Sequence, residues 1–274
     1  MPRQPETDRS LSTPLRSPET VMRLARIGSF HQSRLSFMRV LLRRLKQQGW
    51  RFDRPVWEID ERGVGIATYR AIGPERTYTL VAFAHDLPDD QRSDRVIAEA
   101  WDATFTLYDG EPTEQDIARL ALQVPLQEAG RISGSELVLS RANRSVRLFK
   151  HVIDCLADGA QPDRDLIEPV GYLMRTTAVY GSGKFGAADR DIWADRAEFR
   201  GSFQPELLSV WLIRSFTLDL VEHMARVKAP ETAVPLSPDL RHRFGVGNST
   251  GLGMAPFLLT HPLLLHRWID DRET

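Results

Sequence analysis

Residues that could bind an anion gather in two glycine-rich segments in the second half of the chain. The first is RTTAVYGSGKFGAADRD, residues 175–191, in which three glycines surround Lys184. Glycines let the backbone turn so that successive N–H groups face one anion. A lysine among them supplies the point charge that a phosphate or a carboxylate requires. The residues of this segment that we expect to bind a ligand are Arg175, Ser182, Gly183 and Lys184.

The first segment fits neither of the two common glycine-rich nucleotide motifs. A P-loop requires Ser or Thr directly after its lysine, whereas Phe185 follows Lys184. A dinucleotide-binding turn follows a strand, whereas the pattern of residues 163–178 predicts a helix. The alternative to an anion site is a loop between helices, whose glycines end the preceding helix. The sequence leaves both interpretations open.

The second glycine-rich segment is GVGNSTGLGMAPF, residues 245–257. It contains three residues whose side-chain oxygens commonly accept the free N–H groups at the start of a helix: Asn248, Ser249 and Thr250. A helix start also attracts anions through its free N–H groups and its dipole. One cap residue does not require four glycines, so we expect either another helix or a ligand to approach this backbone closely.

Within this segment, GNSTGLGMAP is similar to the G-S-S-x-M-P loop of the fumarase and aspartase superfamily. The lysine and the asparagine that follow in that loop are absent here, so the resemblance implies no activity. A short distance further on, His261 precedes Pro262. An unperturbed histidine titrates near neutral pH, as a general base requires, which makes His261 the candidate catalytic residue. A structural role beside its apolar neighbours is the alternative, and whether the protein is an enzyme stays open.

The composition is that of an ordinary globular chain of 274 residues, with a formal net charge of −1. A near-neutral chain argues against a dedicated nucleic-acid-binding protein. The single cysteine, Cys155, cannot form an internal disulfide, which is typical of a reducing cytosol, and we expect it to be a buried structural thiol. With one cysteine and scattered histidines, the sequence has no metal-ligand spacing and indicates no cofactor.

The elements that must hold these segments are predicted from hydrophobic periodicity. Residues 1–18 are polar and rich in Pro and Ser, which predicts a disordered tail, and residues 19–48 repeat apolar side chains at helical spacing. Residues 55–108 alternate apolar and polar side chains between short turns, which predicts three or four antiparallel strands. Beyond residue 111 the pattern predicts only helices, over about 113–125, 140–159, 163–178, 205–227 and 237–245 and after Gly253.

The expected fold class is therefore α+β: an N-terminal helix, a small antiparallel sheet of three to four strands, and then a mainly α-helical half. We expect a tail over 1–18, helix and sheet over 19–110, and the helical half over 111–274, the last two forming one continuous domain or two. Charged residues interrupt the apolar helix at 205–227, which indicates a buried helix rather than a membrane span. The apolar end of the chain favours a fragment of a longer protein.

Our leading hypothesis is a soluble cytoplasmic protein that binds a small anionic metabolite through the two glycine-rich segments. The rival is a non-catalytic interaction module, and its basis is charge. Residues 14–54 carry ten basic and two acidic residues, whereas residues 55–130 carry six basic and fifteen acidic residues. The basic helix at 19–48 would then bind an acidic protein or, less in keeping with a neutral chain, nucleic acid. A protein partner or a homo-oligomer stays open, and no membrane partner is expected.

Overall fold

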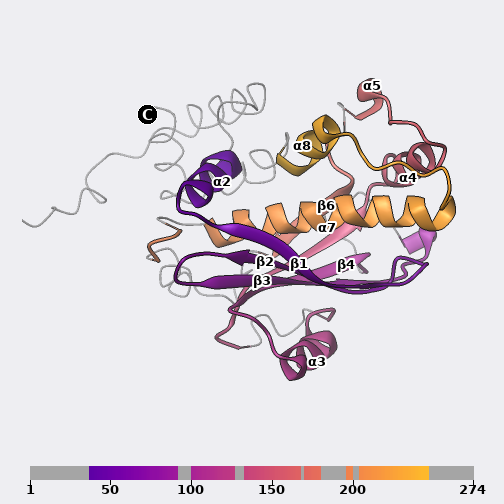
Figure 1. Ribbon diagram of the computed structural model, residues 1–274. Helices are drawn as coiled ribbons and strands as arrows, with labels where there is room; N and C mark the ends of the chain where they lie inside the picture. Colours follow the sequence, from indigo (N-terminus) through magenta and orange to yellow (C-terminus); the bar gives the residue numbers. More distant parts are fainter. Residues whose placement is uncertain are drawn as a thin grey trace, which may run out of the picture.

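One antiparallel sheet of six strands forms the centre of the protein in a computed structural model that describes residues 37–91, 100–126, 133–167, 170–179, 196–199 and 204–246. The strands lie side by side in chain order (Figure 1). They are β1 (Arg51–Ile59), β2 (Gly65–Ile72), β3 (Thr77–Ala84), β4 (Ala103–Asp109), β5 (Glu136–Arg144) and β6 (Met174–Val179). Because every neighbouring pair is antiparallel, alternate strands run in the same direction.

Helices cover the two faces of the sheet unequally. One face, called the first face here, packs against α7 (Gln204–Lys228), and α2 (Phe37–Gln47), α4 (Phe149–Ala157), α5 (Arg164–Ile167) and α8 (Pro238–Val246) lie on the same side (Figure 1). The opposite, second face has α3 (Glu114–Gln123). A short 3-10 helix, Asp89–Gln91, follows β3. No helix within these described ranges is both long and apolar enough to cross a bilayer.

The main core lies between the first face and α7. Phe216, at the middle of α7, is fully buried, and its ring contacts three aromatic rings of the sheet. The ring centroids lie 5.5 Å away for Phe105, 6.0 Å for Trp57 and 6.4 Å for Tyr69. Contacts of this kind remove large apolar areas from water, at about 25 cal/mol for each Å². The apolar surface of α7 therefore explains why the helix lies across the sheet.

On the second face, α3 is held by a smaller core and by one ion pair. Leu120 and Val124 of the α3 region are fully buried against Val81 and Leu139 of the sheet. The guanidinium of Arg119 donates to the buried carboxylate of Glu136 over 2.9 Å. A capping box at Thr113 begins the helix, as its sequence predicts.

The expected sheet of three to four strands followed by a helical half is wrong, because the sheet has six strands and extends to Val179. The predicted helix over 140–159 contains the end of β5 and, after a break, α4. β5 is covered on both faces, so its sequence lacks the clean alternation of a half-exposed strand. Arg141 and Arg144 are also three residues apart, which imitates the polar side of a helix. Pairing with β4 and β6 decides in favour of the strand.

The predicted helix over 163–178 is wrong for a different reason. Only Arg164–Ile167 is helical there, and β6 begins at Met174. Pro169 lies between the two elements in the sequence, and proline cannot continue a helix interior. The β-branched Thr176 and Thr177 favour a strand after it.

Three other predicted helices are confirmed. The apolar segment at 205–227 forms α7, the segment at 113–125 contains α3, and the segment at 237–245 forms α8. The Ser237 hydroxyl accepts from the Leu240 N–H over 3.4 Å, as the side chain of an N-cap residue does. α8 continues one residue beyond the predicted end at 245, to Val246. Of the helix predicted over 19–48, only Phe37–Gln47 is described, and the tail over 1–18 and the stretch after Gly253 lie outside the described residues.

The turn from β1 to β2 depends on Gly65. Its φ of +140° is rare for residues with a side chain, and an added Cβ would overlap the Glu58 carbonyl oxygen. We expect Gly65→Ala to lower the free energy of unfolding by about 3 kcal/mol, because backbone strain and a backbone clash act together. Gly49→Ala is the matched control, since Gly49 has a φ of +79° but nothing within 4 Å of an added Cβ. It should cost only about 1 kcal/mol. Urea denaturation measures both values, and an equal decrease in the free energy of unfolding of the two variants would contradict this account of the turn.

Candidate functional site

The structure describes one of the sequence-predicted site residues, Arg175, which lies near the start of β6 opposite Asn143 of β5. Seven others lie outside the described residues: Ser182, Gly183, Lys184, Asn248, Ser249, Thr250 and His261. What the structure does describe is the scaffold from which both glycine-rich segments begin. β6 includes the first five residues of the first segment and ends at Val179, and α8 includes the first two residues of the second segment and ends at Val246.

The residues that follow the first glycine-rich segment are fixed at one end of the sheet. The guanidinium of Arg196 donates to the Asp109 carboxylate over 2.7 Å and to the Tyr78 hydroxyl over 2.9 Å. From α2, Arg44 donates to the carbonyl oxygens of Glu198 and Phe199 over 2.9 and 2.8 Å. Asp109 ends β4, and β6 runs in the same direction as β4. The chain therefore leaves β6 toward the same end of the sheet at which residues 196–199 are held.

Tyr78 is the buried centre of this anchor. Its hydroxyl is hydrogen-bonded to the Glu198 carboxylate, and its ring packs against Trp50 and Phe199 at centroid distances of 5.9 and 5.0 Å. Burial, together with the Glu198 hydrogen bond, raises the pKa of Tyr78 above its usual range, although Arg196 opposes the shift. The hydroxyl therefore stays protonated at neutral pH, as a structural hydrogen-bond donor requires.

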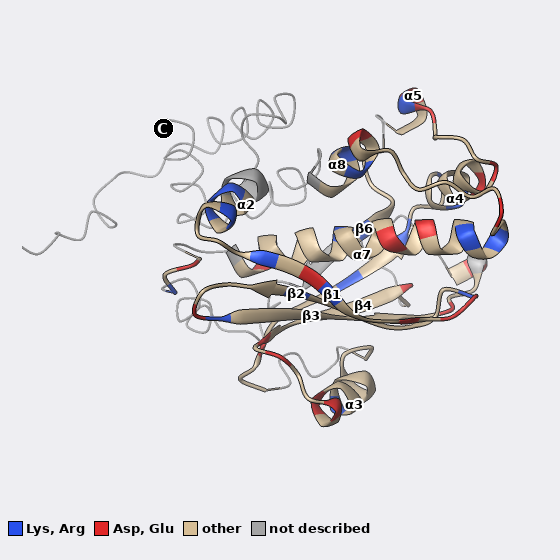
Figure 2. Ribbon diagram, viewed as in Figure 1, with Lys and Arg blue, Asp and Glu red and all other residues tan. Residues whose placement is uncertain are grey.

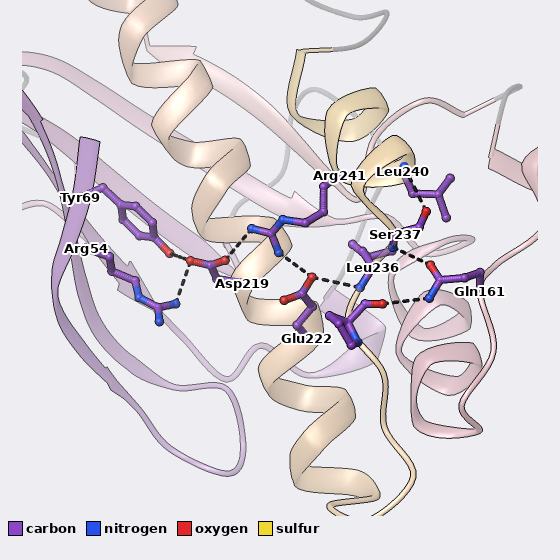
Figure 3. Close-up of polar contacts among 10 residues, drawn as sticks. Arg54, Tyr69, Gln161, Asp219, Glu222, Leu236, Ser237, Leu240 and Arg241 are labelled. Atoms are coloured by element: carbon purple, nitrogen blue, oxygen red, sulfur yellow. Dashed lines mark hydrogen bonds and ion pairs between the residues drawn. The ribbon is translucent and has the colours of Figure 1, made fainter. Parts of the chain in front are cut away.

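A polar network holds α8, the helix whose last two residues begin the second glycine-rich segment (Figure 3). The Asp219 carboxylate of α7 accepts from the Arg54 guanidinium over 2.8 Å, from the Tyr69 hydroxyl over 2.7 Å and from the Arg241 guanidinium over 3.0 Å. The Glu222 carboxylate accepts from Arg241 over 2.5 Å and from the Leu236 N–H over 3.1 Å. These contacts join β1, β2 and α7 to α8, and we call them the Asp219 network.

The Asp219 network is balanced in charge, because two guanidiniums face two carboxylates. Burial alone would lower the pKa of Arg241, but hydrogen bonds to Asp219 and Glu222 outweigh it and raise that pKa. Burial and the negative charge of Asp219 raise the pKa of Tyr69. A network that satisfies its own charges has little to offer an ionic ligand, so its role is to position α8.

Arg214 of α7 fixes the far end of α8. Its guanidinium donates to the Gly245 carbonyl oxygen over 3.2 Å, two residues before Gly247. Burial lowers the pKa of Arg214 to about 10, which leaves it charged at neutral pH. A charged side chain in an apolar helix needs polar partners, and the Gly245 carbonyl oxygen at the end of α8 is one of those of Arg214.

A different set of polar side chains lies on the second face, near the end of the sheet where β3 finishes and β6 starts. Thr104 of β4 lies opposite Arg141 of β5, and Arg141 lies opposite Thr177 of β6. Opposite residues share a face and successive residues alternate, so Arg141 and Arg175 project from the same face on neighbouring strands. The Arg141 guanidinium stacks over the Trp101 ring, 3.9 Å from its centroid.

Sequence reasoning missed Arg141 because it placed this residue in a helix. The continuous apolar run of Leu137, Val138 and Leu139, which is typical of a buried strand, is the signal that could have revealed β5. It also missed His85, which directly follows β3 and continues the alternation of the residues that face the second side. The His85 Nε2 lies 3.1 Å from the Thr104 hydroxyl, a hydrogen bond whose donor depends on the tautomer.

Arg175 lies away from the glycines of the first glycine-rich segment. Val179, the end of β6, is four positions further along the strand, which is about 13 Å at 3.3 Å per residue. The neighbours that the structure gives to Arg175 are therefore the second-face residues around Arg141. The sequence had grouped it with Lys184 because the two residues are close in the chain.

Cys155 and the potential metal ligands of the described residues do not provide a further candidate for a reactive site. Burial, reinforced by Asp158 and Asp154, raises the pKa of the Cys155 thiol, so it stays protonated at neutral pH. Its Sγ lies 3.6 Å from His151 Nε2 on the same helix, α4. Within the described ranges, no three His, Cys, Asp or Glu side chains are grouped so that they could hold a metal ion.

The basic helix of the rival hypothesis is partly used inside the protein. Lys and Arg are prominent on the described part of α2 (Figure 2). Arg44 is committed to the carbonyl groups of residues 198 and 199, whereas Arg43 and Lys46 are exposed. A partner that binds this helix would therefore meet Arg43 and Lys46, and charge reversal at Arg44 would disturb the fold.

Comparisons of this chain with protein-family models, with curated proteins and with solved structures find no match. The function is therefore argued from the residues and their geometry alone.

Asp219→Asn tests the role of the Asp219 network. We expect it to lower the free energy of unfolding by about 2 kcal/mol, because the variant leaves two guanidiniums without their shared charge in a half-buried setting. Asp239→Asn is the matched control, since the Arg164–Asp239 pair is more than half exposed on both sides. The control should cost less than about 1 kcal/mol. The measurement is urea denaturation, and equal losses in the two variants would show that the network is no more than a surface ion pair.

His85 makes stability depend on pH. Burial lowers its pKa, and the Asp102 charge only partly offsets this, so the unfolded chain binds the proton more tightly than the folded protein. The resulting stability is present above the unfolded pKa of about 6.5 and is lost as the pH falls below it. We expect His85→Gln to reduce the loss of unfolding free energy between pH 7.5 and 5.5. Urea titrations at both pH values measure it, and an unchanged loss would refute the assignment to His85.

Proposed function

We propose that this protein binds a small metabolite bearing a phosphate or a carboxylate through its glycine-rich segments. The observation that carries the proposal is the fixed scaffold around residues 180–195. β6 leads into this stretch, and residues 196–199 follow it, anchored at the end of the sheet toward which β6 runs. Segments that a rigid scaffold holds at both ends are common sites of binding and catalysis.

The sequence of this stretch supplies the chemistry. Gly183 and its neighbouring glycines allow backbone N–H groups to face an anion, and Lys184 and Ser182 add a charge and a hydroxyl. The second segment would contribute through Asn248, Ser249 and Thr250, which begin where Arg214 and the Asp219 network hold α8. His261 would move a proton if the ligand reacts. The proposed ligand is therefore small and negatively charged.

Lys184→Ala tests this proposal directly. Inorganic phosphate and malonate should raise the Tm of the wild-type chain at constant ionic strength, because a ligand that binds only the folded state stabilises it. We expect Lys184→Ala to lose at least two thirds of that rise. Lys150→Ala is the matched control, because Lys150 is an exposed lysine on α4, whose side chain is 87% accessible. The proposal fails if neither anion raises Tm, or if Lys184→Ala and Lys150→Ala respond like the wild type.

A further inference from the structure

We infer that the second face of the sheet carries an anion-binding site of its own, formed by Arg141 and Arg175 with Trp101 and Thr104. Only described residues form this site, and it does not require the glycine-rich segments. Its ligand class is a small phosphate or carboxylate. It thereby gives Arg175, a residue that the sequence assigns to ligand binding, a defined set of neighbours.

The first step of the argument is the uncompensated charge of Arg141. Its guanidinium is partly buried, its Nε is buried without a hydrogen-bond partner, and no carboxylate of the described chain pairs with it. Burial lowers the pKa of Arg141, and no charge among the described residues offsets this shift. Elsewhere in the sheet region, arginines of similar exposure are paired: Arg119 with Glu136, Arg196 with Asp109 and Arg241 with Asp219. Arg141 therefore differs from these arginines, and an anionic ligand would supply the negative charge that a carboxylate supplies to the others.

The second step is the placement of Arg175. Arg141 faces Thr177 in the register and Arg175 faces Asn143, so the two arginines are diagonal neighbours on adjacent strands. Diagonal neighbours are about 7–8 Å apart at the backbone, within reach of two long side chains. Two like charges at this spacing repel each other unless an anion lies between them. Planar guanidiniums bind phosphate and carboxylate oxygens in pairs, which suits this geometry.

The third step is the polar surface beside the arginines. Thr104 lies directly opposite Arg141, and its hydroxyl is close to His85. Thr106, two residues further along β4 on the same face, is fully buried, and its Oγ1 has no hydrogen-bond partner in the described part of the chain. Buried hydroxyls normally find a partner, so an unsatisfied hydroxyl diagonal to Arg141 is a second sign of a missing polar group. Stacking on the Trp101 ring holds the guanidinium of Arg141 in place.

Phosphate titration of full-length variants by calorimetry, at constant ionic strength, tests the inference. We expect Arg141→Gln to weaken phosphate binding at least tenfold and Arg175→Gln at least fivefold, because each removes charge-assisted hydrogen bonds. Arg147→Gln is the matched control, since Arg147 is an exposed arginine just after β5, and it should change the affinity less than twofold. Malonate titrations show whether carboxylates bind in the same way. The inference is overturned if the two site variants bind phosphate like the wild type, or if Arg147→Gln weakens binding as much as they do.

A second readout does not depend on the folding of the arginine variants. Phosphate should change the intrinsic tryptophan fluorescence of the wild type, and Trp101→Phe should abolish that change while a phosphate-dependent rise in Tm remains. An equal fluorescence change in Trp101→Phe would count against the site. Lys184→Ala separates the two proposals. Loss of phosphate binding in Lys184→Ala with full binding in Arg141→Gln upholds the glycine-rich site and overturns this one, and the reverse result does the opposite.

Discussion

The burial of α7 against the first face of the sheet is the constraint on which the other elements depend. α7 contacts β2 to β6 directly, and its Trp211 and Phe216 meet Phe52 and Trp57 of β1. The same helix also packs against α2, α4 and α8. Because α7 reaches all six strands, the sheet and the first-face helices share one core through it. The positions from which both glycine-rich segments begin are therefore fixed by a single helix.

The two faces of the sheet differ in how their arginines are paired. On the first face, the Asp219 network pairs each guanidinium with a carboxylate, so charge serves to orient α8. On the second face, Arg119 is paired in the same way, but Arg141 stacks on an aromatic ring, and no carboxylate of the described ranges pairs with it. Taking a charge partly out of water is unfavourable unless a partner compensates it. This difference is the basis on which we propose Arg141, rather than the Asp219 network, as a ligand-binding position.

Sequence reasoning recovers the elements whose patterns are local. The first three strands alternate between short turns, and α7, α3 and α8 have clear apolar periods or caps, so each was predictable. β5 was not, because a strand covered on both faces loses the alternation that identifies it, and β6 lies in a segment whose pattern predicts a helix over 163–178. For the same reason the candidate site was only partly predictable. Arg175 could be chosen by residue type, but its neighbour Arg141 is 34 positions away in the chain, and only strand pairing brings them together.

The first strand of the sheet has one further property that matters outside the molecule. β1 is an edge strand, its register shifts between Asp53 and Val56, and Pro55 within that interval has no N–H to donate. An open strand edge is a template on which another polypeptide can add a strand, and repeated addition leads to fibrils. The irregular backbone at Pro55 interrupts such a ladder after a few residues. The described part of this edge therefore offers an added strand an interrupted row of N–H donors.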